Sequence, residues 1–154
     1  MRIGIAGYGV VGRRRQVCIS ETDGMALVAV CDHRHPGRES LEDDVAFHGT
    51  YQGLLSEDLD ALFVCMSNDM AAEVTIAGLE RGLHVFCEKP PARSMEELER
   101  VIRTEREHPR LKLMYGFNHR YHESVEDALR IVDSGELGEV ISLRGVYGKS
   151  QLIT

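Results

Sequence analysis

The sequence predicts an α/β domain built on a doubly wound parallel sheet, followed by only the beginning of a second α+β domain. Short apolar runs of strand length alternate with segments whose apolar residues recur at helical spacing. The runs are almost continuously hydrophobic, as in Ala26–Val30, which is typical of strands covered on both faces. This alternation indicates a parallel sheet with helices packed against it.

Five strands and two central helices are expected from these patterns. The helix Met70–Arg81 has Gly82 as its C-cap, and the helix Met95–Glu107 begins with a capping box formed by Ser94 and Glu97. The interval His33–Thr50 reads as a loop with a short helix over Ser40–Phe47. The expected strands are Arg2–Ala6, Ala26–Cys31, Ala61–Cys65, Leu83–Cys87 and Leu111–Tyr115.

The pattern changes after Tyr115. A helix is expected over Tyr121–Ser134 and an apolar strand over Val140–Tyr147. We therefore divide the chain into a domain at 1–120 and the start of a truncated substrate or oligomerisation domain at 121–154. An apolar strand without a sheet has unpaired edges, so Val140–Tyr147 is expected either to be disordered or to pair with a second copy in a homo-oligomer.

Composition excludes several classes of protein. The chain has 154 residues, 43% of them hydrophobic, and a formal charge of -7, which argues against nucleic-acid or anionic-membrane partners. It contains no apolar run long enough to span a bilayer and no signal peptide at its start, so a cytoplasmic location is expected. The four cysteines have no C-x-x-C spacing, which predicts reduced core thiols and no metal site.

A glycine-rich turn follows the first expected strand. Gly7, Gly9 and Gly12, with Val10 and Val11 between them, form G-x-G-x-x-G at the start of a helix, the dinucleotide-binding signature of a Rossmann fold. The glycines allow a tight turn, and the amide groups of the helix N-terminus favour a pyrophosphate. For the basic run Arg13–Arg15 we favour a solvated helix face over a contact to the pyrophosphate.

Asp32 follows Gly12 by about 20 residues, at the end of the second strand. Its carboxylate would accept hydrogen bonds from ribose hydroxyls and repel a 2′-phosphate, which favours NAD over NADP. Arg34 complicates this preference, because it could cover an adenine ring or meet a 2′-phosphate. The alternative for Asp32 is a simple turn residue.

Polar side chains follow the later strands. Ser67 and Asn68 are either helix caps or contacts to the dinucleotide. Glu88 and Lys89 stand near the expected nicotinamide end, the alternative being a surface ion pair. Asn118, His119 and Arg120 suit recognition of a polyhydroxylated or anionic substrate, whereas His84, His108 and His122 are read as structural.

The triplet Glu88-Lys89-Pro90, together with the glycine turn, Asp32, His84–Cys87 and Gly116–Arg120, resembles the Gfo/Idh/MocA oxidoreductase family. The resemblance implies NAD(P)-dependent oxidation of a secondary alcohol of a sugar or nucleotide sugar, as in surface-polysaccharide pathways. It also implies that Glu88 lines the cofactor site and that Lys89 positions the substrate or transfers a proton. Members continue into a second domain that supplies much of the substrate pocket, and Ser142–Lys149 resembles its first strand.

Two functions therefore stand side by side. The first is the cofactor-binding portion of a sugar dehydrogenase. The second is a free-standing dinucleotide-binding module without catalytic activity, so the sequence does not decide whether this chain alone is an enzyme.

Overall fold

The computed structural model describes residues 1–34, 39–40, 45–146 and 148. The chain divides into two compact units, Met1–Phe117 and Asn118–Thr154.

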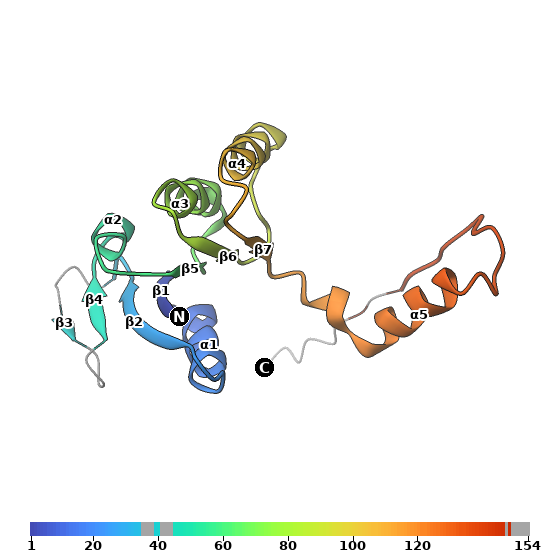
Figure 1. Cartoon of the computed structure of the whole chain (residues 1–154), viewed down its shortest axis with the longest axis horizontal. Coiled ribbons are helices and arrows are strands. Elements are labelled where there is room, and N and C mark those ends of the chain that lie inside the picture. The colour runs from blue at the N-terminus through green and yellow to red at the C-terminus, as the bar shows by residue number, and fades with distance from the viewer. Residues whose placement is uncertain (35–38, 41–44, 147, 149–154) are drawn as a thin grey trace. The chain divides into compact units, whose positions relative to one another are not determined.

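The first unit is built on a seven-stranded sheet with the order β3-β4-β2-β1-β5-β6-β7 (Figure 1). All neighbouring strands run parallel except β3, which pairs antiparallel with β4 at one edge. In chain order the six parallel strands follow the pattern 3-2-1-4-5-6, so the winding direction reverses between β1 and β5. The strands are β1 (Arg2–Ala6), β2 (Ala26–Cys31), β3 (Glu39–Ser40), β4 (Ala46–His48), β5 (Ala61–Val64), β6 (His84–Cys87) and β7 (Leu113–Tyr115).

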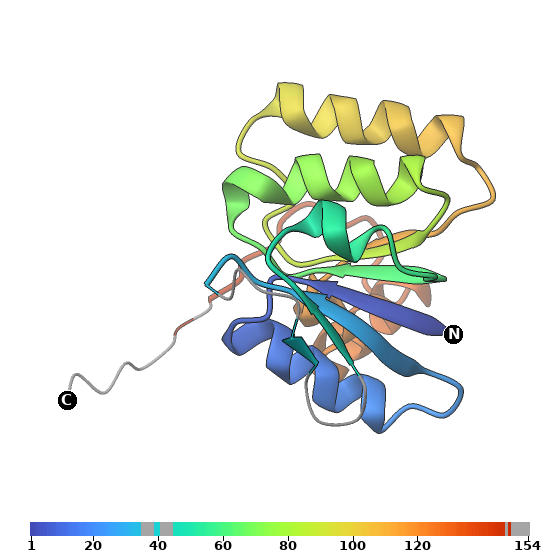
Figure 2. The ribbon, with the colours of Figure 1, turned by 90° about the vertical axis from the view of Figure 1, so that its left-hand side faces the viewer.

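Helices cover both faces of this sheet. Figure 2 shows α1 (Val10–Ser20) on one face and α2 (Tyr51–Leu54), α3 (Asn68–Glu80) and α4 (Met95–Glu107) on the other. The expected α/β fold with a doubly wound parallel sheet is therefore confirmed. No helix among the described residues is both long and apolar enough to cross a membrane.

Each face of the sheet has its own hydrophobic core. On β1, Ile3 and Ile5 join a cluster with Ile19 of α1, whereas Ala6 joins the cluster that contains Leu79 of α3. All five side chains are 0 to 1% exposed. Because successive residues of a strand point to opposite faces, a strand between two helical layers must be apolar throughout.

The ends of α3 and α4 follow the predicted caps. Gly82 after α3 has φ +86°, and the Ser94 hydroxyl at the start of α4 accepts a hydrogen bond from the Glu97 N–H at 3.2 Å. The reciprocal half of the capping box is displaced by one residue, because the Glu97 carboxylate accepts from the N–H of Arg93 at 2.8 Å.

The expected helix over Ser40–Phe47 is wrong at both ends. Ser40 belongs to β3 and Phe47 to β4, while 41–44 lie outside the described residues. β4 adds to the edge of β2, and Phe47 is 4% exposed in the core cluster of α1. Pairing to an existing sheet edge and burial of Phe47 thus override the local pattern.

The second unit starts with a 3-10 turn, η2 (Asn118–Tyr121), which leads into α5 (Glu123–Asp133). The helix expected over Tyr121–Ser134 is thus confirmed in its main part. The strand expected from Val140 is wrong over 140–146, where no strand forms; Tyr147 and Lys149 lie outside the described residues. Ile141 and Leu143 are 92% and 86% exposed, and a strand needs a hydrogen-bonding neighbour that the described part of this unit does not offer.

Candidate functional site

The turn after β1 crosses the backbone at the end of β5. Gly7 has φ +91°, and a Cβ placed on it would stand 2.5 Å from the carbonyl oxygen of Cys65. A Cβ on Gly12 would stand 2.2 Å from the carbonyl oxygen of Gly7. The first glycine is therefore required by its backbone conformation and by the close approach to β5, and the third by the packing of α1 on the turn.

This turn is held from both neighbouring strands. The N–H groups of Gly7 and Tyr8 donate to the Cys31 carbonyl at the end of β2, at 2.9 and 3.1 Å. On the other side, the Cys65 N–H donates to the Ala6 carbonyl at 2.7 Å. The turn thus lies at the point where the winding of the sheet reverses, which is where open α/β sheets bind ligands.

The N-terminus of α1 is free to receive an anion. Gly9 is the N-cap, no acidic residue occupies the first turn, and Val10 and Val11 are 69% and 40% exposed. The first helical hydrogen bond runs from Arg13 N–H to Gly9 C=O at 3.0 Å, so the preceding N–H groups have no partner within the helix. These amides fit a pyrophosphate.

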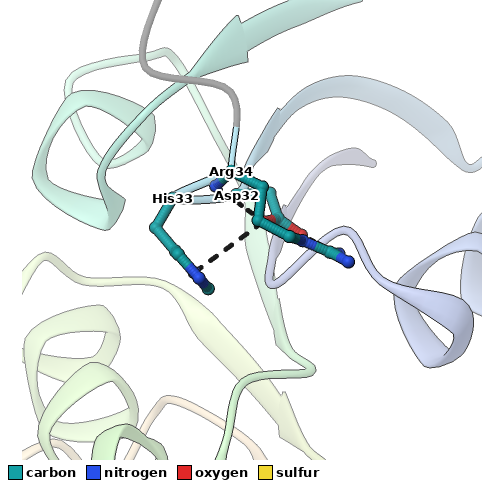
Figure 3. A network of polar contacts seen from close by, with 3 residues as sticks. All are labelled: Asp32, His33 and Arg34. Carbon is teal, nitrogen blue, oxygen red and sulfur yellow. Dashed lines mark hydrogen bonds and ion pairs between the residues drawn. The ribbon is translucent and has the colours of Figure 1, made fainter.

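Asp32 lies directly after β2, and its side chain is 6% exposed. Figure 3 shows His33 and Arg34 around its carboxylate. Arg34 donates to Asp32 from its backbone N–H (3.1 Å), Nε (3.0 Å) and Nη2 (2.7 Å), while His33 Nδ1 lies 3.8 Å away. The Arg34 hydrogen bond is the main reason that the pKa of Asp32 falls to about 2. Asp32 is thus a buried acceptor whose carboxylate is fixed by Arg34. The hydrogen bond from the Arg34 N–H is also the contact of an Asx turn, so the interpretation as a turn residue stands beside the predicted ribose contact.

Two adjoining pockets lie along this edge of the sheet. The smaller, of about 170 Å³, lies between the glycine turn and the Asp32–Arg34 pair, and the larger, of about 430 Å³, continues toward the residues after β4. They share His33, Met66 and Ser67. The larger pocket is also lined by four residues that were not predicted as site residues, Gly49, Thr50, Tyr51 and Gln52. Their only signal in the sequence is that they follow β4, and β4 was predicted to be part of a helix.

Ser67 and Asn68 follow β5. Ser67 is the N-cap residue of α3, but its hydroxyl does not cap the backbone; it helps to lower the pKa of Asp69 by a hydrogen bond. Asn68 is the first residue of the helix, and both side chains are exposed. Ser67 lines both pockets, a position compatible with its predicted contact to the dinucleotide.

Glu88 follows β6 and pairs with Arg15 of α1, not with Lys89. The Arg15 Nε donates to Glu88 Oε1 at 2.8 Å, its Nη2 makes a second, closer contact, and the two side chains are 29% and 15% exposed. Reading the basic run as a solvated face is therefore wrong for Arg15. Nothing local in the sequence signals this pair, because its partners are 73 residues apart in the chain.

Lys89 is exposed at the same strand end, and its peptide bond to Pro90 is cis. Asn118, His119 and Arg120 form η2 of the second unit, where all three are exposed and the His119 ring stacks on His122 at 6.5 Å. Two of the three histidines read as structural contact the backbone: His84 Nδ1 accepts from Lys112 N–H at 3.0 Å, and His108 Nδ1 lies 2.9 Å from the Thr104 carbonyl oxygen. The third, His122, contacts a side chain instead, with its Nδ1 3.2 Å from the Ser124 hydroxyl.

The cysteines are free thiols, and Cys31 and Cys87 are buried as predicted for core thiols. Cys65 is only partly buried, and the prediction is wrong for Cys18, which is exposed. Burial raises the pKa of Cys31 to about 11 and that of Cys65 to about 12, so neither is a thiolate near neutrality. Among the residues that the structure describes, no group of three or more His, Cys, Asp or Glu side chains could hold a metal ion.

A glycine turn at the winding reversal, a free helix N-terminus and a buried carboxylate at the end of β2 define a dinucleotide-binding Rossmann domain. Comparison with known families agrees: residues 1–117 match the Gfo/Idh/MocA model, described as an oxidoreductase family with an NAD-binding Rossmann fold. The chain belongs to this family and carries its NAD-binding domain.

Individual relatives are similar over most of this chain. The inositol 2-dehydrogenase of Salmonella typhimurium is 30% identical over 151 residues, covering 94% of this chain and 45% of the relative. The D-xylose 1-dehydrogenase (NADP(+)) 2 of Haloferax volcanii is 34% identical, covering 92% and 43%. The crystal structure of myo-inositol 2-dehydrogenase from Lactobacillus plantarum superposes with a TM-score of 0.78 at 27% identity, covering 92% and 43%. The chain thus spans less than half the length of these relatives.

Proposed function

We propose that this chain forms the cofactor half of an oxidoreductase that oxidises a secondary alcohol of a sugar or nucleotide sugar and prefers NAD to NADP. The observation that carries the proposal is one small pocket lined both by the glycine turn at the start of α1 and by the buried Asp32 with its partner Arg34. The names of the relatives, which are inositol and xylose dehydrogenases, support a polyol or sugar as the substrate.

The proposed binding mode assigns each part of the dinucleotide to a strand end. The amides from Gly9 to Gly12 hold the pyrophosphate, and Asp32 accepts from the adenosine ribose. Ser67 and Asn68 border the bridge between the two halves. The 2′-phosphate of NADP would meet the buried carboxylate of Asp32, which disfavours it, although Arg34 offers a cation at the same place.

The reaction centre is proposed at the end of β6. When bound, the nicotinamide supplies the hydride acceptor. Glu88 lines this end of the site, and the exposed Lys89 orients the substrate hydroxyl and takes its proton. Asn118, His119 and Arg120 stay predicted substrate-binding residues, and they lie in η2 at the start of the second unit. The substrate or oligomerisation domain predicted from 121 onward stays part of this proposal.

Association into a homo-oligomer is part of the same proposal. The exposed apolar side chains of α5 and of the segment after it support it, among them Leu129, Ile131, Ile141 and Leu143. Light scattering over a range of concentrations should give a mass above that of one chain, and a monomer at every concentration would contradict it.

Calorimetric titration tests cofactor binding directly. The chain should bind NAD⁺ more tightly than NADP⁺, and Asp32→Ala should weaken NAD⁺ binding at least tenfold, because a charged acceptor is lost. Asp23→Asn is the control, because Asp23 is an exposed acidic residue in the loop between α1 and β2, and NAD⁺ affinity should not change. Absence of binding to either dinucleotide by the folded wild type would refute the proposal.

A second experiment tests the role of Lys89. Lys89→Met should keep NAD⁺ affinity within about twofold yet abolish sugar-dependent NADH formation wherever the wild type shows it, since proton transfer by a positioned group contributes ~100-fold or more. Equal turnover by the wild type and the variant would remove Lys89 from the mechanism.

A further inference from the structure

The ion pair between Arg15 and Glu88 is not part of the glycine motif, which ends at Gly12. Arg15 is in the second turn of α1, its guanidinium carbon lies 4.9 Å from the centre of the Phe86 ring, and two of its nitrogens contact one carboxylate oxygen of Glu88. Stacking and double hydrogen bonding fix the guanidinium in both position and plane.

Glu88 is held from the strand side as well. Its N–H donates to the Val64 carbonyl at 2.9 Å, and its Oε2 lies 2.9 Å from the point where a Cβ on Gly116 would stand. The carboxylate is therefore confined between α1 and the ends of β6 and β7. Burial lowers the pKa of Arg15, but the hydrogen bond to Glu88 and its charge outweigh burial, so the net shift is upward.

The position of this pair relative to the glycine turn indicates which part of a dinucleotide it faces. β2, which carries Asp32, lies on one side of β1, whereas β5 and β6 lie on the other. A dinucleotide crosses the winding reversal with one nucleotide on each side, and Asp32 takes the adenosine side. Glu88 and Arg15 thus belong to the nicotinamide side.

Charge at the nicotinamide side discriminates between the two redox forms of the cofactor. The nicotinamide ring carries a positive charge in NAD⁺ and none in NADH, while the rest of the molecule is the same. A lone carboxylate near the ring would favour NAD⁺, and a lone guanidinium would favour NADH. Because the pair is mostly buried, salt screens it less than a surface pair.

We propose that Arg15 is a positioning residue that neutralises Glu88 and thereby sets the relative affinity of the chain for NAD⁺ and NADH. This inference rests on the proposed binding of the dinucleotide across the carboxyl ends of β1, β2 and β6. A merely structural role, the anchoring of α1 to the end of β6, would weaken both redox forms equally.

The test is a double-mutant cycle with two ligands. Dissociation constants of NAD⁺ and NADH are measured by calorimetry for the wild type, Arg15→Gln, Glu88→Gln and the double variant. Arg15→Gln should raise the ratio Kd(NADH)/Kd(NAD⁺) roughly fivefold and Glu88→Gln should lower it by a similar factor, the size expected for one uncompensated, partly screened charge. The double variant should return to within about twofold of the wild-type ratio.

Two further variants separate charge from geometry. Arg15→Lys keeps the positive charge, so its ratio should stay near that of the wild type even if both affinities fall. Arg2→Gln removes a cation at the opposite end of β1, where Arg2 pairs with Asp58, and should leave the ratio unchanged.

The outcomes separate the two claims. A folded wild type that binds neither NAD⁺ nor NADH refutes the proposed function. Binding with an unchanged ratio in both single variants refutes only the role of Arg15. Should Arg15→Gln lose its thermal transition, Glu88→Gln decides by itself, because a ratio that does not fall when the carboxylate becomes an amide contradicts the proposal.

Discussion

Replacing Asp32 by asparagine should shift the cofactor preference of the chain toward NADP. The substitution keeps the size of the side chain but removes the charge that now accepts three hydrogen bonds from Arg34. Two effects follow at one position: the ribose of NAD loses a charged acceptor, and the 2′-phosphate of NADP no longer meets a carboxylate.

The magnitude follows from the burial of this carboxylate, whose side chain is 6% exposed. Hydrogen bonds to a charged acceptor contribute ~1 kcal/mol more than those to a neutral one, which costs NAD about fivefold in affinity. Removing the repulsion between Asp32 and a phosphate at contact distance gains NADP about 1 kcal/mol even at the dielectric constant of water. The preference should thus move by about 2 kcal/mol, roughly thirtyfold.

The assay is a pair of calorimetric titrations, with NAD⁺ and NADP⁺, on the wild type and on Asp32→Asn. Arg34→Gln is the matched variant, because it leaves the carboxylate in place and removes the cation. It should weaken NADP⁺ more than NAD⁺, which is the opposite shift in preference.

A change of less than threefold in the ratio Kd(NADP⁺)/Kd(NAD⁺) for Asp32→Asn would refute this reasoning. It would mean that the ribose is bound elsewhere, or that Arg34 keeps its place over the asparagine and shields the site. If Arg34→Gln also leaves the ratio Kd(NADP⁺)/Kd(NAD⁺) unchanged, Arg34 has no part in recognition, and the first case, a ribose bound elsewhere, is the correct one.

Four further predictions concern stability and reactivity. Gly12→Ala puts a Cβ 2.2 Å from a backbone oxygen, so the free energy of unfolding should fall by about 1–3 kcal/mol in a urea titration, with loss of NAD⁺ binding. Ser94→Ala should cost ~1 kcal/mol in the same titration and leave NAD⁺ affinity intact, since it removes only the cap of α4. The pKa of Asp32, lowered from 3.8 to about 2, implies stability that is present above about pH 4 and lost as the pH falls toward 2. In Arg34→Gln the free energy of unfolding should therefore change less with pH over that interval. Cys18, the exposed cysteine, should react first with a thiol reagent at mildly alkaline pH, and equally rapid reaction of all four thiols would contradict the lower exposure of the others.

The repeating pattern of the sequence was enough to predict the central fold. β1, β2 and α4 begin and end where periodicity and caps predicted, because continuous apolar runs and a Ser94–Glu97 pair are local signals. The edge of the sheet was not predictable in this way. β4 is three residues long and becomes a strand because β2 offers it hydrogen-bonding groups and the core accepts Phe47.

The candidate site divides along the same line. The sequence by itself determined the glycine turn and Asp32, since a required φ at Gly7 and close backbone contacts leave only certain residue types at fixed spacing. Only the tertiary structure showed which side chains the two site carboxylates bind: Asp32 binds Arg34, and Glu88 binds Arg15. An ion pair between a helix and a strand end far along the chain depends on how the two elements pack, and no spacing in the sequence encodes that distance.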